Sequence, residues 1–358
     1  MRPGWAATPI RYDIKMENSL NSSIVTITGG TGSFGMTMVR KLLEENVAEI
    51  RIFSRDENKQ EFMRGIFKDS RTRFIIGDVR DASSVDVAIK GSDYIFHAAA
   101  LKQVPSCEFF PMQATATNIL GSSNVIDSAL KHEVKAIVCL SSDKAVYPIN
   151  AMGMTKGLME KVAQSFARNY PDSKTKISIT RYGNVMMSRG SVIPLFLNQI
   201  QKGLPVTITN SAMTRFMMSL DDSVNLVKYA FTNSITGDLF VKKAPACTVL
   251  TLATAIARLL DKEKSLKIEY IGTRHGEKLF ESLLGVEEQS RSIDMGEYFR
   301  VPLDTRSLDY QVYFEKGQNN TEVKAYTSEN TQQLGVDEVV NLIAGLPEFV
   351  NFKKGNQW

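Results

Sequence analysis

The chain has 358 residues, of which 43% are hydrophobic and 23% charged, and its formal net charge is +4 at pH 7. This composition is typical of a soluble globular protein, and it contains neither a basic block that would follow a nucleic acid nor an apolar run long enough to cross a membrane. Three widely spaced cysteines, Cys107, Cys139 and Cys247, exclude a disulfide framework and a zinc spacing. We therefore expect a cytoplasmic protein without a bound metal.

Short β-branched runs alternate with helical patterns from Ile24 onward. The runs fall at residues 24–27, 50–53, 74–76, 94–96, 136–140 and 177–179. This alternation predicts an α/β fold with a doubly wound parallel sheet. We expect a polar tail over residues 1–21 and a Rossmann domain over 22–190 and about 219–243. A smaller substrate-binding lobe would take about 191–218 and 244–358.

A glycine-rich segment follows the first predicted strand and opens a helix. Gly29, Gly32 and Gly35 allow a tight turn, a close approach of backbone to pyrophosphate, and close packing of helix on strand. The helix N-terminus would present N–H groups to the phosphates. The segment predicts a dinucleotide site formed by Thr28, Gly29, Thr31, Gly32, Ser33, Phe34 and Gly35.

The end of the second strand decides which dinucleotide is favoured. An NAD-binding fold has an acidic residue there, but this chain has Ser54-Arg55 followed by Lys59. Arg55 can form two hydrogen bonds to a 2′-phosphate, so NADP is favoured over NAD, although a solvated charged turn fits the same residues. Asp78 and Val79, after the third strand, are placed to meet the adenine.

The fifth strand is followed by Ser142, Asp143 and Lys144. Ligands of doubly wound sheets bind at this edge, and an adjacent acid and base can exchange protons with a substrate. Lys156 follows on a predicted helix over residues 152–169, on the same face as Met152. By spacing alone, a surface turn pair and a solvated helix lysine are the more common explanation of these residues.

Seven segments together resemble the extended short-chain dehydrogenase/reductase family. Within that family the sequence is similar to bacterial UDP-N-acetylglucosamine 4,6-dehydratases of the configuration-inverting capsule and O-antigen type. The segments are residues 27–35, 53–57, 97–105, 143–153, 181–185, 188–194 and 273–278. Most of the superfamily has a Tyr-x-x-x-Lys motif, where this chain has Met152 and Lys156. A thioether cannot titrate, so the group that deprotonates the sugar 4-OH is left open.

The resemblance implies that UDP-N-acetylglucosamine is oxidised at C4, loses water across C5 and C6, is reduced at C6 and is inverted at C5. It makes Lys144 the C5 base, which requires a lowered pKa, and Asp143 the acid for the departing 6-OH, which requires a raised one. Lys156 would hold the nicotinamide ribose, and Ser142 would bond the 4-oxygen. His97 is more typical of a packed strand-end residue than of a catalyst.

The resemblance also implies the remaining contacts. Arg274 and Glu277, at an expected helix start, would meet the diphosphate and the uridine ribose. Lys102 and Arg189 are equally compatible with structural roles. The other implied residues are Ala98, Ala99 and Asn118 for the cofactor, which Lys102 would also contact, and Asn184 and Val192 for the substrate. A homo-oligomer such as a hexamer is expected.

Three other readings remain open at this point. A UDP-hexose 4-epimerase would share the cofactor and the C4 oxidation but would not need Asp143 and Lys144. A configuration-retaining dehydratase would differ only in the stereochemistry at C5. A non-catalytic NADP sensor would explain Met152, but it would not explain the Asp143-Lys144 pair or residues 274–278.

Overall fold

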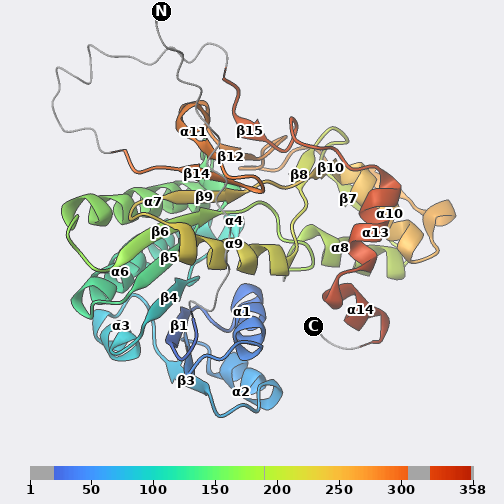
Figure 1. The fold of residues 1–358 in the computed structure, drawn as a ribbon. Helices are drawn as coiled ribbons and strands as arrows, with labels where there is room; N and C mark the ends of the chain where they lie inside the picture. The colour runs from blue at the N-terminus through green and yellow to red at the C-terminus, as the bar shows by residue number, and fades with distance from the viewer. Residues whose placement is uncertain (1–19, 189, 305–322, 356–358) are drawn as a thin grey trace, which may run out of the picture.

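The computed structural model describes residues 20–188, 190–304 and 323–355. Within these residues a nine-stranded sheet forms the centre, in the order β13-β14-β9-β6-β5-β4-β1-β2-β3 (Figure 1). The strands from β9 to β3 in this order are parallel, and β14 and β13 add antiparallel at one edge. The strands are β1 (Ile24–Thr28), β2 (Glu49–Ser54), β3 (Thr72–Ile76), β4 (Tyr94–His97), β5 (Ala136–Leu140), β6 (Lys176–Arg181), β9 (Leu239–Lys242), β13 (Ile293–Asp294) and β14 (Tyr298–Val301).

The doubly wound parallel sheet expected from the sequence is confirmed. All six predicted strands form, and helix α9 (Leu220–Asn233) leads into β9, which pairs parallel with β6. The expectation for the C-terminal part needs a correction. Residues 293–301 were assigned to the smaller lobe, but β14 pairs along β9 and carries β13 with it. The tail is described only at Leu20 and Asn21, and residues 1–19 lie outside the described part.

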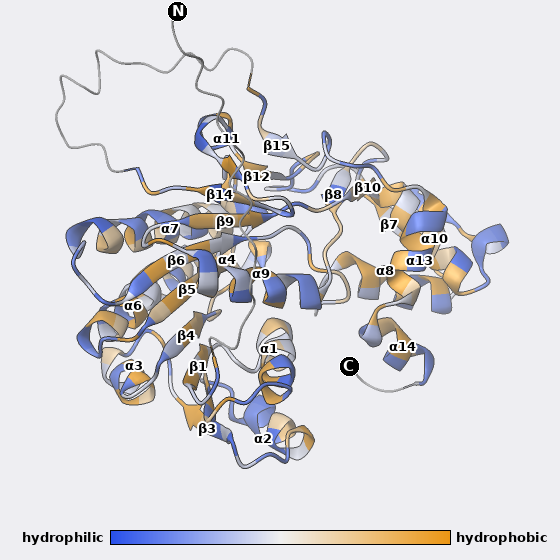
Figure 2. Ribbon diagram, viewed as in Figure 1, coloured by the Kyte–Doolittle hydropathy of each residue, from blue (hydrophilic) through white to orange (hydrophobic). Residues whose placement is uncertain are grey.

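Helices cover both faces of the sheet (Figure 1). One apolar cluster packs the sheet against α1 (Ser33–Leu43), α2 (Glu57–Ile66) and α9. Another packs the opposite face against α3 (Ala82–Ile89), α6 (Gly121–Lys131) and α7 (Ala151–Asn169). Figure 2 shows the reason: the central strands are hydrophobic almost throughout, whereas the helices are hydrophobic on one side only.

Short elements follow β4 and β5 on the edge where the parallel strands end. They are α4 (Val104–Phe109), α5 (Pro111–Ala114), the π-helix η1 (Thr115–Leu120) and the single 3₁₀ turn η2 (Asp143–Ala145). Because β1 to β6 run in the same direction, the glycine turn, Ser54, Asp78, Ala98, Ser142 and Tyr182 all lie along this one edge.

A third apolar cluster forms a smaller lobe beside the sheet (Figure 1). Its helices are α8 (Val192–Gln201), α10 (Val249–Leu259), α13 (Val336–Ala344) and α14 (Pro347–Lys353), with the 3₁₀ turn η3 (Glu263–Ser265). Three further strand pairs form separate small sheets: β7 (Val206–Ile208) with β11 (Ile268–Tyr270), β8 (Thr214–Phe216) with β10 (Ala246–Thr248), and β12 (Ser282–Leu284) with β15 (Tyr326–Thr327). The first pair packs in the lobe cluster, whereas Phe216, Ala246 and Leu284 of the other two pack against the central sheet. Helix α11 (Val286–Arg291) follows β12. In the described part of the chain, no helix is long and apolar enough to cross a membrane.

Candidate active site

The glycine turn has the shape that a dinucleotide phosphate needs. Gly29 has φ +67°, and a Cβ on it would lie 2.8 Å from the Ala99 Cα. A Cβ on Gly35 would lie 2.2 Å from the Gly30 carbonyl oxygen, so helix α1 packs closely on the turn. A Cβ on Gly32 would have only the Gly29 carbonyl oxygen within 4 Å, at 3.3 Å. Among the described residues, no side chain caps the N-terminus of α1. The backbone at the N-terminus of α1 is therefore open to an anion.

The end of β2 carries two of the expected cations, but both have carboxylate partners. The Arg55 guanidinium lies 3.5 Å from the Asp78 carboxylate and is half exposed, and Lys59 lies 2.6 Å from Asp56. Asp78 is also bound by Arg80, which lowers the pKa of Asp78. Ser54 is buried and accepts a hydrogen bond from Gln60, and Val79 is buried against Gly121. A cationic group, formed by Arg55 and Arg80 around Asp78, therefore borders the expected ribose site.

Two residues expected at the cofactor support the loops around it. The Thr28 hydroxyl is buried, bonds His97 Nδ1 at 2.7 Å and accepts the Ala99 N–H at 3.3 Å. Asn118, in the π-helix, is fully buried and bonds both backbone groups of Leu101 and the Thr155 hydroxyl. These side chains fix the Ala98–Leu101 segment after β4, and their contact with a cofactor stays a prediction. His97 also bonds Ser122, and burial lowers its pKa to about 3, as suits a packed residue.

Asp143 and Lys144 lie together in a largely buried cluster. The Asp143 side chain is almost fully buried, and its Oδ1 accepts hydrogen bonds from Ser142 Oγ at 2.9 Å and Lys144 Nζ at 3.1 Å. Lys144 Nζ also lies 3.3 Å from Glu281 Oε1, which comes from the segment before β12. Glu281 is 3% exposed and lies 3.9 Å from the Arg215 guanidinium. Lys144 is thus held between two buried carboxyl groups.

The protonation of this cluster agrees with the expectation for the acid but not for the base. Burial raises the pKa of Asp143 despite the nearby Lys144, and the Glu281 charge adds to the rise. Burial acts to lower the pKa of Lys144, but Asp143 and Glu281 outweigh it and raise that pKa. The lowered pKa expected for Lys144 was therefore wrong. The pKa of Glu281 is lowered because Lys144 and Arg215 outweigh the effect of burial. The two carboxyl groups consequently have opposite shifts.

Lys156 and Met152 lie on α7, which begins one residue before the predicted helix. The N-cap Asn150 accepts a hydrogen bond from Gly153 N–H, which fixes where this helix starts. Met152 is buried with Cys107 and Ala114, and Lys156 donates a hydrogen bond to the Leu140 carbonyl oxygen at 2.7 Å. Burial lowers the pKa of Lys156 to about 8. This lysine therefore lies at the end of β5 and loses its proton at a lower pH than an exposed lysine.

The segment that holds Arg274 and Glu277 is a turn, so the expected helix start is wrong. Gly276 has φ +69°, and its carbonyl oxygen accepts a hydrogen bond from Asn150 Nδ2 at 2.8 Å. Arg274 is exposed, and Glu277 lies 3.6 Å from Arg215. Lys278 Nζ donates to the Val146 carbonyl oxygen at 2.5 Å. These contacts bring the turn against residues 143–150.

The structure places three of the other expected substrate residues, and the fourth lies outside the described part of the chain. Asn184 follows β6, and its side-chain oxygen is buried without a hydrogen-bond partner among the described residues. Val192 begins α8, and Lys102 is exposed in the loop after β4. Arg189 lies outside the described residues. Asn184 and Val192 therefore lie near the two ends of the segment that leads from β6 to α8 of the smaller lobe.

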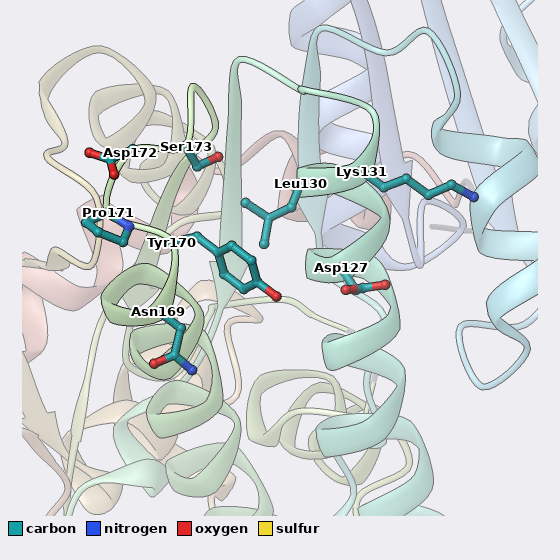
Figure 3. Close-up of a pocket in the computed structure, with 8 residues that line it drawn as sticks. All are labelled: Asp127, Leu130, Lys131, Asn169, Tyr170, Pro171, Asp172 and Ser173. Atoms are coloured by element: carbon teal, nitrogen blue, oxygen red, sulfur yellow. The ribbon is translucent and has the colours of Figure 1, made fainter.

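A separate hollow lies at the opposite edge of the sheet. Its volume is about 510 Å³, and its lining residues are Asp127, Leu130, Lys131, Asn169, Tyr170, Pro171, Asp172 and Ser173 (Figure 3). They come from the C-terminal ends of α6 and α7, where β5 and β6 begin, and Lys131 is paired with Asp86 at 2.9 Å. The hollow is therefore remote from the acid/base cluster.

Sequence reasoning missed Glu281, Arg215 and Lys278. Lys278 and Glu281 lie in or just after the segment 273–278, which already carried the resemblance, so a search for further charges beside it would have found them. Arg215 Nη1 donates to the Thr214 carbonyl oxygen at 2.8 Å, and Arg215 Nη2 donates to the Lys278 carbonyl oxygen at 3.0 Å. No sequence pattern indicates these contacts, because β8 and β12 are joined only by tertiary packing.

The chain is similar to known proteins over most of its length. Residues 25–303 match the family described as polysaccharide biosynthesis protein, and residues 304–349 match its C-terminal family. A UDP-glucose 4-epimerase of Rickettsia canadensis (strain McKiel) is 52% identical over 325 residues, covering 89% of this chain and 95% of the relative. A UDP-glucose 4-epimerase of Rickettsia prowazekii (strain Madrid E) is 51% identical over the same shares.

Solved structures show the same fold. Pen from Bacillus thuringiensis is 34% identical, with a TM-score of 0.82 over 91% of this chain and 99% of that chain. The dTDP-glucose 4,6-dehydratase DesIV from Streptomyces venezuelae, solved with NAD, is 22% identical, with a TM-score of 0.65 over 72% of this chain and 86% of that chain. The chain therefore belongs to the polysaccharide biosynthesis protein family and has the extended short-chain dehydrogenase/reductase fold.

Proposed function

We propose that this enzyme is an NADP-dependent, C5-inverting 4,6-dehydratase of UDP-N-acetylglucosamine. Its product would be UDP-2-acetamido-2,6-dideoxy-β-L-arabino-hex-4-ulose, a precursor for a bacterial surface polysaccharide. The observation that carries the proposal is the buried Asp143–Lys144–Glu281 cluster. Burying three ionisable groups is costly, and elimination of water is the reaction that needs both an acid and a base at this place.

The fit of a nicotinamide dinucleotide rests on the glycine turn and on the cations after β2. Gly29, Gly32 and the N-terminus of α1 would hold the pyrophosphate, and Arg55 the 2′-phosphate. When bound, such a cofactor supplies the oxidation at C4 and the later reduction at C6. Lys156 would bond the nicotinamide ribose from the end of β5 and lower the pKa of the sugar 4-OH.

Elimination then needs only the residues of the buried cluster. A C4 ketone acidifies the C5 hydrogen, which Lys144 removes as a proton, and the electron pair of that bond forms the C5–C6 double bond. Asp143 gives its proton to the 6-hydroxyl, the C6–O bond breaks and water leaves. For this, Asp143 must be protonated and Lys144 neutral. One proton shift from Lys144 Nζ to Asp143 Oδ1, which are 3.1 Å apart, converts the ion pair into this state. After the reduction at C6, C5 takes a proton from solvent on the face opposite Lys144, which inverts it.

The proposed NADP selectivity is tested at Arg55. Replacing Arg55 with alanine should weaken NADP binding about 10- to 100-fold, because one charge-assisted contact to the 2′-phosphate is lost. NAD binding should change little. Arg64→Ala is a matched control, since Arg64 is equally exposed on α2 and pairs with Glu61. Titration of protein fluorescence with each dinucleotide measures both. Equal losses for NADP and NAD would assign Arg55 to another role.

The missing phenolate is tested at Met152. Met152→Tyr should speed the first oxidation by up to about 100-fold if proton removal from the 4-OH limits it. Stopped-flow absorbance of the reduced nicotinamide measures this step. Met154→Tyr, on the exposed side of the same helix, is the control for added bulk. An unchanged rate with normal cofactor binding would show that this proton transfer is not limiting.

A UDP-hexose 4-epimerase is the second candidate, because the named Rickettsia relatives carry that description at 51–52% identity. It would use the same cofactor site and oxidation but would return the C4 hydrogen to the other face. Incubation with UDP-N-acetylglucosamine separates the two, since only the dehydratase product has lost one water in its mass spectrum. A retaining dehydratase would lose the same water but keep the C5 configuration.

A further inference from the structure

Glu281 is a buried carboxylate whose backbone is fixed on both sides. Its N–H donates to Ser328 Oγ at 2.9 Å, and its carbonyl oxygen accepts the Ser328 N–H at 2.8 Å. This pairing joins the segment before β12 to β15 and leaves the Glu281 side chain at the acid/base pair. The carboxylate is therefore placed by rigid backbone, not by a mobile surface loop.

The contacts of the Glu281 side chain are unusual for a structural ion pair. Oε1 lies 3.3 Å from Lys144 Nζ and 3.9 Å from Arg215 Nε. Oε2 is buried and has no hydrogen-bond partner among the described residues, and the same holds for Asp143 Oδ2. A carboxylate that served stability alone would satisfy both oxygens. Two half-satisfied carboxyl groups on either side of one lysine suggest a site for proton transfer.

We infer that Glu281 is the third member of the acid/base centre, a positioning residue that holds Lys144 against Asp143 and sets the pH range in which that pair works. The inference rests on the proposed dehydration. Glu281 acts through Lys144 and Asp143 and does not itself take a proton from the sugar. Arg215, which bonds the backbone of the 278–279 segment, keeps Glu281 in place.

The charges around the pair determine the direction of the effect. Asp143 is faced by Lys144, Glu281 and Tyr182, and Glu281 by Lys144, Arg215 and Lys278. The negative charge of Glu281 raises the pKa of Asp143 and, together with Asp143, that of Lys144. Removing this charge must therefore lower both pKa values. The acid limb of the rate profile reports Asp143 and the alkaline limb Lys144, so both limbs should move to lower pH.

The experiment compares Glu281→Gln with Glu281→Asp and wild type across pH. Glu133→Gln, an exposed glutamate paired with Lys174, is the matched control. Product formation from UDP-N-acetylglucosamine is followed by mass spectrometry, and C5 exchange by NMR in deuterium oxide. In Glu281→Gln, the alkaline limb should move down by roughly 1 to 3 pH units, and the acid limb in the same direction. Glu281→Asp keeps the charge and should keep both limbs near their wild-type positions.

The outcomes distinguish this inference from the proposed function. If wild type releases no water, the dehydration itself fails. If wild type dehydrates and Glu281→Gln loses rate with both limbs unmoved, Glu281 is only structural and the inference is overturned. A thermal unfolding scan accompanies each variant. If Glu281→Gln does not fold, the Glu281→Asp profile decides. The inference predicts activity and pH limbs near those of wild type in Glu281→Asp, because the charge is kept. A structural role predicts a lower rate in Glu281→Asp.

Discussion

Replacing Lys144 with alanine is expected to abolish exchange of the C5 proton and to slow loss of water by about 100- to 10,000-fold. Lys144 Nζ lies 3.1 Å from Asp143 Oδ1 and is mostly buried. No other amine of the described residues forms an ion pair with Asp143. Oxidation at C4 should persist, because it needs Lys156 and the cofactor, and reduced nicotinamide should accumulate. NMR in deuterium oxide measures exchange, and absorbance measures the oxidation.

A companion variant separates the acid from the base. Asp143→Asn should still exchange C5 protons but should not release water, because an amide cannot donate to the 6-hydroxyl as a carboxylic acid does. Lys174→Ala is the control, since Lys174 is exposed and pairs only with Glu133. Retained exchange in Lys144→Ala would contradict the role proposed for Lys144, whatever the behaviour of Asp143→Asn.

Replacing Arg181 with methionine is expected to destabilise the fold by about 3–5 kcal/mol. Arg181 is 4% exposed, and its guanidinium binds Glu160 of α7, Glu288 of α11 and the Leu283 carbonyl oxygen of β12. Removing the arginine leaves the buried Glu160 carboxylate and the partly buried Glu288 carboxylate without their partner. Urea unfolding measures the change in the free energy of unfolding.

The same network positions the site. Glu160 lies one helical turn after Lys156, and β12 directly follows Glu281, so Arg181 ties both to the end of β6. Arg258→Met is the control, because Arg258 forms surface pairs with Glu263 and Asp337, and its replacement should lower the free energy of unfolding far less. The double variant Arg181→Met, Glu160→Gln should recover part of the loss. A loss below about 1 kcal/mol in Arg181→Met would contradict the structural role assigned to this network.

The sequence was sufficient for those parts of the fold that depend on local pattern. The β-branched runs and the glycine spacing predict the parallel strands and the turn between β1 and α1, because period and backbone freedom are local properties. The place of Asp143 and Lys144 also follows from one strand end. The antiparallel β14 could not be predicted, since its pairing with β9 depends on which strand edge remains open after folding.

The protonation of the site could not be predicted for a related reason. A lowered pKa for Lys144 was expected from burial or from a neighbouring cation such as Lys156, and burial does act in that direction. The opposing charges are those of Asp143, the preceding residue, and of Glu281. Glu281 is far away in the sequence and is brought to Lys144 only by the tertiary structure. Likewise, Asn118 and Thr28 have the residue types of ligand contacts, but tertiary hydrogen bonds to Leu101 and His97 occupy their side chains.

The most direct test of the proposed function is the NMR spectrum of the product formed from UDP-N-acetylglucosamine in deuterium oxide with NADP. A C5-inverting dehydratase predicts a C6 methyl group, a C4 ketone, and deuterium at C5 in the inverted configuration. A 4-epimer that keeps its 6-hydroxyl and its C5 proton would contradict the account and would favour the epimerase. A C6 methyl with the original C5 configuration would retain the dehydration and contradict the inversion.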